Sequence, residues 1–413
     1  MDYENLYSKM LANKYLTSKE IMYDTNVNIL LSPHEYKAFL DYKSTILKSG
    51  NKFMTPLDLK SFNDQPLFFS LSNDLVSIEE SYVDLVIEDI KTNEKTLFVR
   101  NFDDITLSRI YSEIEGTLNI EHVPTTRKIV SELVKEKRDP QNLNEQIIKN
   151  MWEGIGFVHN CPEFNEENLF KLYSILSKGC LDDEDKLLEG NIYRHDGVEV
   201  DNYQGCPVEL IKPCMDSLFE FFKKNKDDST IRVLLPHIAH YYIAYIHPYF
   251  DYNGRTARMV SYWISILTNK TGIPPTSSEG INQTKNDYYS SLRETRNAYN
   301  DLTYFLTYIF DVSVRYFLTY KNIEEIDQKL KNNGIVLTNN EKMYFKKILI
   351  SNKGKFLHQD FCTWIGVEMS KQGALKVLNA LESYGLLKSE TTPSNKKLFF
   401  VNDEILRYRF RKD

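Results

Sequence analysis

The chain has 413 residues, of which 42% are hydrophobic and 26% are charged, and its formal net charge at pH 7 is −7. This composition excludes a disordered chain, and the acidic balance argues against wholesale nucleic-acid binding while leaving room for a local basic patch. The length predicts two or three domains.

Cysteine usage and the start of the chain indicate a cytoplasmic protein. There are five cysteines, an odd number, and no two form a CxxC pair. Reduced thiols fit this pattern better than a disulfide framework or a zinc site. The chain begins without a basic region followed by an apolar core, and no apolar run reaches about 18 residues. We therefore expect no signal peptide and no membrane span.

The first 100 residues predict an α+β segment that packs on the rest of the chain. Helices are expected at 18–22 and 32–47. Short strands rich in apolar residues are expected at 67–69, 82–87 and 96–99. Nothing in this segment indicates chemistry.

Residues 103–116 predict an amphipathic helix. Its apolar face is spaced at i, i+3, i+4 and i+7, and comprises Leu107, Ile110, Tyr111 and Ile114. Asp103 or Asp104 can cap the start of this helix, and Gly116 can end it. Glu115 stands at the end, where by itself a glutamate is most simply a solvated side chain.

A β-hairpin is expected after the amphipathic helix at 165–179. Residues 192–194 and 198–200 can pair across His195, Asp196 and Gly197, because Asp-Gly is a strong turn signal. By itself such a hairpin is an ordinary edge element.

The stretch HPYFDYNGRTAR, residues 247–258, carries the strongest chemical signal. It lies between two helix-like runs, so a second helix should begin near Asn253 or Gly254. A helix N-terminus has free backbone N–H groups that bind anions. Arg255 and Arg258 lie on one face of that helix. With the carboxylate of Asp251 they form a plausible site for Mg²⁺-bound polyphosphate.

His247 sits at the edge of this site, and histidine is the commonest acid/base side chain near neutral pH. The alternative interpretation of the whole stretch is a helix–turn–helix of packing residues with an N-capping Asn253.

Two further helices follow. Residues 281–296 include Tyr288 and Tyr289, and residues 301–320 read as a long closing helix. A tyrosine pair at this spacing fits a core face as well as a ligand contact.

The C-terminal part has a different pattern, with a polar linker at 321–337. Residues 338–413 predict three short helices and two strands, which resemble a winged-helix domain. From Leu386 to Asp413 there are seven Lys/Arg and four Asp/Glu, a net of +3. Such a domain serves as a DNA-binding, protein-binding or dimer module, so DNA, a protein partner and a homodimer all stay open.

The stretch 247–258 resembles the signature of the Fic (filamentation induced by cAMP) family, HPFx[D/E]GNGRxxR. Seven positions match, namely His247, Pro248, Asp251, Asn253, Gly254, Arg255 and Arg258. Tyr249 replaces Phe conservatively, whereas Tyr252 replaces a Gly. A tyrosine with positive φ costs roughly 1 kcal/mol or more, so the loop is expected to differ in shape.

The resemblance implies a mainly α fold: a Fic-type helical bundle at 101–320 with a small β-hairpin flap, an α+β segment at 1–100 and the winged-helix domain at 338–413. It implies a protein adenylyltransferase that moves AMP from ATP to a Ser, Thr or Tyr hydroxyl of a target protein. The target would dock on the flap, residues 190–212, by adding a strand to it.

The family roles transfer to the matching residues. His247 would be the catalytic base, Asp251 the Mg²⁺ ligand, and the amides around Asn253 and Gly254 the α-phosphate site. Arg255 and Arg258 would bind the β- and γ-phosphates. Tyr288 and Tyr289 would border the adenine, with Lys285 where Arg is usual. Gly254, rather than the Lys of phosphate-transferring relatives, favours AMP transfer.

The helix at 103–116 is similar to the family's inhibitory helix, with motif [S/T]xxxE[G/N]. Glu115 and Gly116 match, and Tyr111 stands at the Ser/Thr position. The resemblance therefore predicts that Glu115 pairs with Arg258 and blocks the γ-phosphate. The alternatives are a weakly catalytic, nucleotide-sensing, DNA-binding regulator, and the reverse reaction, in which Glu115 positions water to remove AMP.

Overall fold

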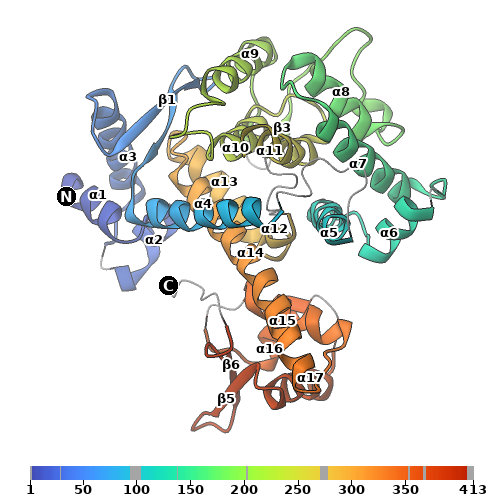
Figure 1. The fold of residues 1–413 in the computed structure, drawn as a ribbon. Helices are drawn as coiled ribbons and strands as arrows, with labels where there is room; N and C mark the ends of the chain where they lie inside the picture. The colour runs from blue at the N-terminus through green and yellow to red at the C-terminus, as the bar shows by residue number, and fades with distance from the viewer. Residues whose placement is uncertain are drawn as a thin grey trace. The chain divides into compact units, whose positions relative to one another are not determined.

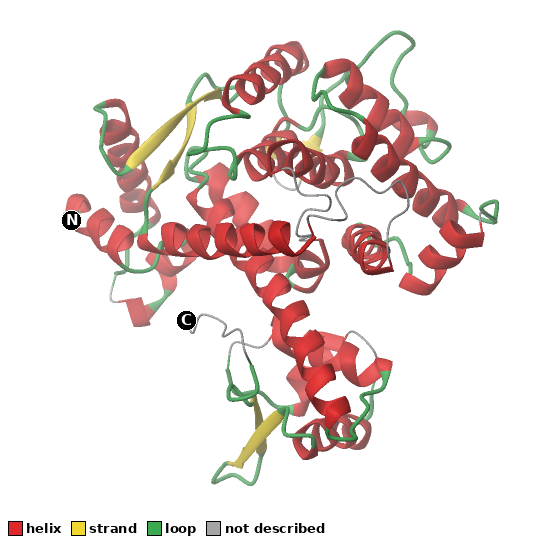
Figure 2. Cartoon of the chain, in the orientation of Figure 1, coloured by secondary structure: helices red, strands yellow, loops and turns green. Residues whose placement is uncertain are grey.

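The structure is a computed structural model that describes residues 2–27, 29–93, 104–136, 138–200, 203–269, 278–351, 354–365 and 369–406. The fold is mainly helical, as predicted, with three small antiparallel hairpins among the described residues (Figure 2). Among the described helices, none combines the length and apolar character needed to cross a bilayer. The chain divides into two compact units, Met1–Ser278 with Lys285–Phe310, and Glu279–Thr284 with Asp311–Asp413.

The first unit begins with helices that surround one hairpin (Figure 1). Its elements are α1 (Tyr3–Ala12), α2 (Ser18–Tyr23), the 3-10 helix η1 (Thr25–Val27), α3 (Pro33–Lys48), β1 (Met54–Lys60), β2 (Pro66–Ser70) and α4 (Asn73–Asn93). Thr17 and Ser32 start α2 and α3 with capping boxes, which confirms both predicted helices.

The strand expected at 82–87 is wrong, because these residues lie inside α4. The buried side chains of Leu75, Ile78, Tyr82 and Leu85 recur at helical spacing, which outweighs the local run of β-formers. The strand expected at 67–69 lies within β2, and β1 was not anticipated. The strand expected at 96–99 lies outside the described residues.

The remainder of the first unit is a helical bundle with a short hairpin. Its elements are α5 (Asp104–Ile120), α6 (Arg127–Glu136), α7 (Leu143–Asn160), α8 (Glu166–Ser177), η2 (Asp183–Asp185), β3 (Glu199–Val200), β4 (Tyr203–Gln204), α9 (Val208–Asn225), α10 (Leu235–Ile246), α11 (Asn253–Asn269), α13 (Lys285–Asn297) and the first part of α14 (Thr303–Asn332). Helix α12 (Ser278–Gln283), apart from its first residue, and the rest of α14 belong to the second unit. Every residue of α10 except Ala244 is buried, so this helix is the centre of the bundle.

A buried charge network joins the N-terminal helices to the bundle. Lys43 Nζ on α3 lies 2.5 Å from Asp301 Oδ2, just before α14, and both side chains are almost fully buried. The hydroxyl of Tyr15 donates to the same carboxylate at 2.6 Å. Removing one member of a buried ion pair strands the other charge, so this network holds the N-terminal segment against the bundle. That segment belongs to the same compact unit as the bundle.

The second unit contains the C-terminal helices and hairpin. They are α15 (Asn339–Ser351), α16 (His358–Ile365), α17 (Lys371–Ser383), β5 (Leu387–Thr391) and β6 (Lys397–Val401). Three helices followed by a hairpin match the expected order of elements, while the winged-helix interpretation and its DNA or protein partner stay predictions. The linker expected at 321–337 is mostly helical, because α14 continues to Asn332 and buries Ile326 and Leu330 in this unit's core.

Candidate functional site

The loop between α10 and α11 is held in one shape by its own side chains. His247 ends α10 with φ 56°, and Tyr252 precedes α11 with φ 66°, so two left-handed residues reverse the chain. The amide of Asn253 closes the loop on Tyr249, accepting from its N–H at 3.0 Å and donating to its C=O at 2.8 Å. Asn253 therefore contributes its side chain to the loop, and only its backbone N–H faces the helix N-terminus.

The structure indicates which tautomer the His247 imidazole adopts. Its Nδ1 lies 3.4 Å from the carbonyl oxygen of Ala244, which can only accept, so Nδ1 carries the proton and Nε2 keeps a lone pair. Burial, opposed by this backbone contact, lowers the pKa of His247 to about 4. The imidazole is therefore neutral at pH 7.

Arg194 fixes this loop to the flap. Its Nε donates to the carbonyl of His247 at 2.8 Å, and its backbone N–H donates to the carbonyl of Pro248 at 2.9 Å. The same guanidinium donates to the carbonyl of Cys206, at the far end of the hairpin. Sequence reasoning missed this role, since a single Arg in a polar segment gives no signal of burial.

The flap hairpin is displaced from its predicted position. The strands are β3 and β4, with Val200 opposite Tyr203, so the pairing of 192–194 with 198–200 is wrong. The reason is that Arg194 is an anchor rather than a strand residue. Tyr203 on β4 donates its hydroxyl to the carbonyls of Ala244 and Tyr245, at 3.3 and 3.2 Å. The flap thus lies against the end of α10, beside His247.

The N-terminus of α11 already holds a carboxylate. The first intrahelical bond runs from Thr256 N to Tyr252 O, so the N–H groups of residues 253–255 have no partner within the helix. A Cβ on Gly254 would lie 2.5 Å from Glu121 Oε1. A side chain at position 254 would therefore displace the carboxylate of Glu121 from its present position.

Arg258 binds the end of α5. Its Nη2 donates to Glu121 Oε1 at 2.5 Å, and its Nε donates to Thr117 Oγ1 at 2.7 Å. The side chain of Arg258 is 3% exposed and that of Glu121 is 27% exposed. The carboxylate opposite Arg258 was predicted to be Glu115, and the structure corrects it to Glu121.

Helix geometry explains this correction. The helix was expected to end at Gly116, but α5 continues to Ile120. Glu115 precedes Thr117 by two residues, which is about 200° around a helix, so it points away from the face that Thr117 shares with Glu121.

The helix ends instead at His122, with φ 58°. Its N–H bonds to Asn119 O and the N–H of Val123 bonds to Leu118 O, which is the Schellman arrangement. The sequence does contain a signal for Glu121. The spacing Thr117-x-x-x-Glu121 fits the inhibitory motif, and His122 stands at the position of the motif's Gly or Asn.

The charges around Glu121 keep it ionised. Burial raises the pKa of its carboxyl, but Arg258 and then Arg255 bring that pKa below its ordinary value. Lys285 is a third cation nearby, and its Nζ donates to the carbonyl of Asn119 at the end of α5. Burial lowers the pKa of Lys285.

Tyr252 adopts the positive φ that glycine would take, and its ring is used in packing. The ring is 2% exposed, and the guanidinium carbon of Arg255 lies 3.4 Å from its centroid. Arg255 Nη2 also lies 3.3 Å from Asp251 Oδ2. Tyr252 thus fixes the orientation of Arg255, which is itself buried.

The two tyrosines of α13 differ in exposure. Tyr288 is 2% exposed and its hydroxyl lies 2.8 Å from His240 Nε2, as expected of a core residue. Tyr289 is 41% exposed, so it alone offers a ring to a ligand. The structure favours the core alternative for Tyr288.

Asp251 fits a magnesium ligand. Its side chain is 47% exposed, and Mg²⁺ commonly takes one or two protein carboxylates together with substrate phosphates. Asp185 is a second carboxylate in this region, missed from the sequence; burial and then the charge of Asp251 raise its pKa. Within the described residues, no group of three or more His, Cys, Asp or Glu forms a metal cage.

Residues 163–265, which include the flap and most of this site, match the model of the Fic/DOC family. The chain contains a Fic domain. No curated protein matches the chain significantly. A crystal structure of a Fic family protein from Desulfovibrio desulfuricans G20 is similar, with a TM-score of 0.51 and 15% identity over 81% of this chain and 97% of that one. This likeness supports the fold alone.

Two other solved structures are similar over a smaller part. A fragment of Fic-1 from C. elegans has a TM-score of 0.47 and 16% identity, covering 70% of this chain and 77% of that one. A Fic domain containing signaling protein from Bacteroides thetaiotaomicron has a TM-score of 0.42 and 18% identity, covering 60% and 95%.

We predict that His247 of the Fic domain stays neutral well below pH 6. Burial disfavours the imidazolium, so its ring resonances should titrate with a midpoint near the pKa of about 4. Nitrogen NMR of imidazole-labelled protein, with His247→Ala for assignment, measures both the midpoint and the Nδ1–H tautomer. A midpoint near 6.5 would contradict the burial of the ring.

We also predict that Tyr252→Gly lowers the free energy of unfolding by about 2–4 kcal/mol. Loss of a buried aromatic ring costs about 3–5 kcal/mol, whereas relief of the positive φ returns only ~1 kcal/mol. Tyr252→Phe is the matched control, because it keeps the ring, and should change stability far less. Denaturant unfolding measures both variants, and a Gly variant as stable as the native protein contradicts the packing role of the ring.

Proposed function

We propose that this protein transfers AMP from ATP to a Ser, Thr or Tyr hydroxyl of a target protein, and that Glu121 holds it inactive. The observation that carries the proposal is the position of the Glu121 carboxylate, against Gly254 and bonded to Arg258. Free helix N–H groups and an arginine are the groups that bind phosphate in proteins. The Glu121 carboxylate lies against these groups, so it competes with a polyphosphate for them.

The base in this mechanism is His247. Its Nε2 lone pair accepts the proton of the target hydroxyl as the hydroxyl oxygen bonds to the α-phosphorus. The bond from the α-phosphorus to the bridging oxygen breaks, and pyrophosphate leaves. Base catalysis of this kind contributes roughly 10²–10⁴-fold.

The anion groups of α11 stabilise the reacting phosphate. Backbone N–H groups near Gly254 face the charge that builds on the α-phosphate, and they need no reorganisation. Arg255, fixed by Tyr252, and Arg258, once released from Glu121, bind the β- and γ-phosphates. Asp251 would hold Mg²⁺, which would neutralise part of the phosphate charge there.

The ion pair between Arg258 and Glu121 accounts for the inhibited form. While Arg258 is bonded to Glu121 and Thr117, its Nε and Nη2 groups are occupied and cannot bind the γ-phosphate as a bidentate pair. The ionised Glu121 also repels a polyphosphate at close range. ATP then binds with its α-phosphate out of line for attack, and a misplacement of about 1 Å costs ~10²-fold in rate.

The target binds through the flap. The strands β3 and β4 form a two-stranded sheet, so each has an unpaired edge to which an extended peptide adds by backbone hydrogen bonds. Arg194 and Tyr203 hold this flap beside His247, which supports the proposal that a strand added to the flap would carry its hydroxyl to the base.

The second candidate is removal of AMP from a modified protein. Glu121 favours it, because an ionised and partly exposed carboxylate in the site can position water. Protein labelled by the released variant, then incubated with native protein, separates the two reactions: loss of label indicates removal.

We predict that Glu121→Gly raises labelling of protein by α-³²P-ATP about 10²-fold over the native protein, because it frees Arg258. Glu115→Gly is the matched control, since it removes a carboxylate from the same helix without touching Arg258, and it should label like the native protein. Autoradiography at equal protein, Mg²⁺ and ATP measures all three.

The double variant with His247→Ala and Glu121→Gly is the control that shows whether labelling depends on His247. It should abolish labelling while ATP binding, measured by calorimetry, remains. Equal labelling of native and Glu121→Gly protein would contradict inhibition by Glu121, and greater labelling by Glu115→Gly would restore the earlier assignment.

A further inference from the structure

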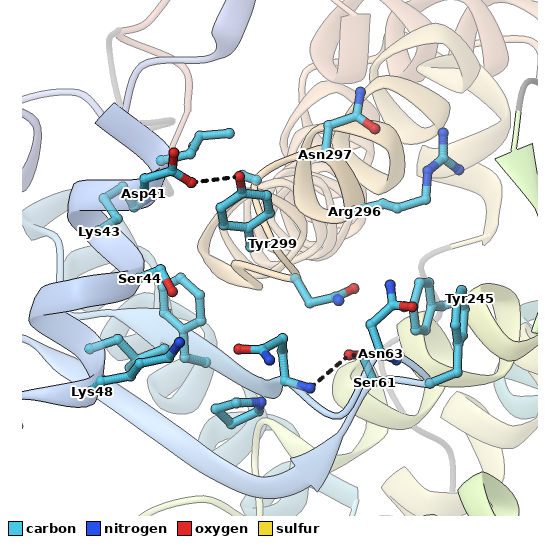
Figure 3. A pocket seen from close by; sticks show the side chains of 18 of the residues that line it. Asp41, Lys43, Ser44, Lys48, Ser61, Asn63, Tyr245, Arg296, Asn297 and Tyr299 are labelled. Carbon is cyan, nitrogen blue, oxygen red and sulfur yellow. Dashed lines mark hydrogen bonds between the residues drawn. The ribbon is translucent and has the colours of Figure 1, made fainter. Parts of the chain in front are cut away.

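A cavity of about 560 Å³ opens in the first unit, away from the anion site (Figure 3). Helix α3, the β1–β2 hairpin, strand β4 of the flap and the turn between α13 and α14 line it. Its volume falls within the range of small-ligand and side-chain pockets, roughly 300–1,000 Å³. Neither the motif of the Fic domain nor the proposed chemistry uses it.

Two cations of this cavity have no carboxylate partner. Lys48 at the end of α3 and Arg296 on α13 lie on opposite sides of the cavity (Figure 3), and neither forms an ion pair within the described part of the chain. The other charges are neutralised or bonded: Lys43 pairs with Asp301, and Asp41 accepts a hydrogen bond from the Tyr299 hydroxyl at 2.9 Å. Lys48 and Arg296 outnumber Asp41, the other charged side chain of the lining outside an ion pair, so the cavity has an excess of positive charge that favours an anion.

The cavity wall contains strained backbone. Tyr299 and Asn300 are consecutive left-handed residues, with φ of 61° and 62°. Their side chains hold this turn, because Asn300 accepts a hydrogen bond from Tyr241 at 2.7 Å and Tyr299 donates to Asp41. Backbone held in such a conformation by its surroundings is common at ligand sites.

The cavity is continuous with the flap and with the catalytic loop. The guanidinium carbon of Arg296 lies 3.8 Å from the ring centroid of Tyr203 on β4. The hydroxyl of Tyr203 donates to the carbonyl of Ala244, the group that the His247 ring also contacts. A peptide strand paired with the free edge of β4 would thus lie beside this cavity.

We propose that the cavity binds an acidic side chain of the target protein, a few residues from the modified hydroxyl, with Lys48 and Arg296 as the recognising groups. The proposal rests on the proposed function, since it extends the strand on the flap. Backbone pairing with the flap accepts any sequence, so a charged pocket next to it supplies the specificity that pairing lacks. A target with Glu or Asp near its hydroxyl is preferred.

A binding experiment tests this without nucleotide. The probe is a fluorescein-labelled peptide with one Thr, β-forming neighbours and Glu at several positions on both sides. The comparison peptide has Gln at every Glu position. Fluorescence anisotropy with the full-length protein at low ionic strength should show the Glu peptide binding about tenfold more tightly, as expected for two partly exposed ion pairs.

Matched variants locate the effect. Lys48→Gln and Arg296→Gln should each remove a large part of the preference for the Glu peptide. Lys37→Gln is the control, because Lys37 is an exposed lysine of the same helix outside the cavity, and it should keep the full preference. If Arg296→Gln disturbs the stacking on Tyr203, the result for Lys48→Gln decides whether the cavity recognises the Glu peptide.

Four results would overturn the proposal: no binding of the Glu peptide, equal binding of both peptides, a preference unaffected by Lys48→Gln, or an equal loss in Lys37→Gln. Displacement of the Glu peptide by inorganic phosphate at low concentration would also overturn it, by indicating a small-anion site. Because the experiment measures binding, a failure to detect AMP transfer would not change its result. AMP transfer without a preference for the Glu peptide would refute the proposed role of the cavity and leave the proposed function intact.

Discussion

The fold of the site depends on how one buried guanidinium is neutralised. Arg258 lies almost fully out of water, and a buried charge without a partner costs several kcal/mol. The end of α5 supplies that partner, with Thr117 and Glu121 on one face of the helix and His122 reversing the chain beyond them. This explains why the end of α5 docks on α11, with the Glu121 carboxylate close to Gly254. Under the proposed function, the carboxylate that pairs with Arg258 is the group that a polyphosphate would have to replace.

A second constraint fixes the catalytic loop from the opposite side. Asn253 holds the loop internally, while Arg194 bonds to the backbone of His247 and Pro248 and to both ends of the flap. Tyr203 then connects the flap to the carbonyls at the end of α10. His247, the flap and the neighbouring cavity are therefore connected by hydrogen bonds and by the stacking of Arg296 on Tyr203. In the proposed reaction, a peptide on the flap would meet a histidine whose tautomer is already set, and only Arg258 would have to change partners.

The sequence predicted the parts of this site that are local in the chain. The helix–loop–helix around 247–258 follows from turn formers and periodicity, and the arginine spacing follows from the helix. Glu121 was missed because Gly116 was taken as a helix end, although a glycine inside a helix costs only about 1 kcal/mol and tertiary packing overrides it. Arg194 and the flap register depend on contacts across some 50 residues, which no local pattern encodes. Tyr252 keeps the loop shape of a glycine because its ring packs on Arg255.

In the proposed inhibited form, Glu121 occupies the place of a phosphate. The most direct test is a pair of crystal structures with Mg²⁺ and a non-hydrolysable ATP analogue, one of the native protein and one of Glu121→Gly. In the Glu121→Gly structure, Arg258 should contact the γ-phosphate, and the α-phosphate should lie at the N-terminus of α11, facing His247 Nε2. In the native structure, Arg258 should remain bonded to Glu121. A native complex with Arg258 already on the γ-phosphate and Glu121 undisturbed would contradict the claim.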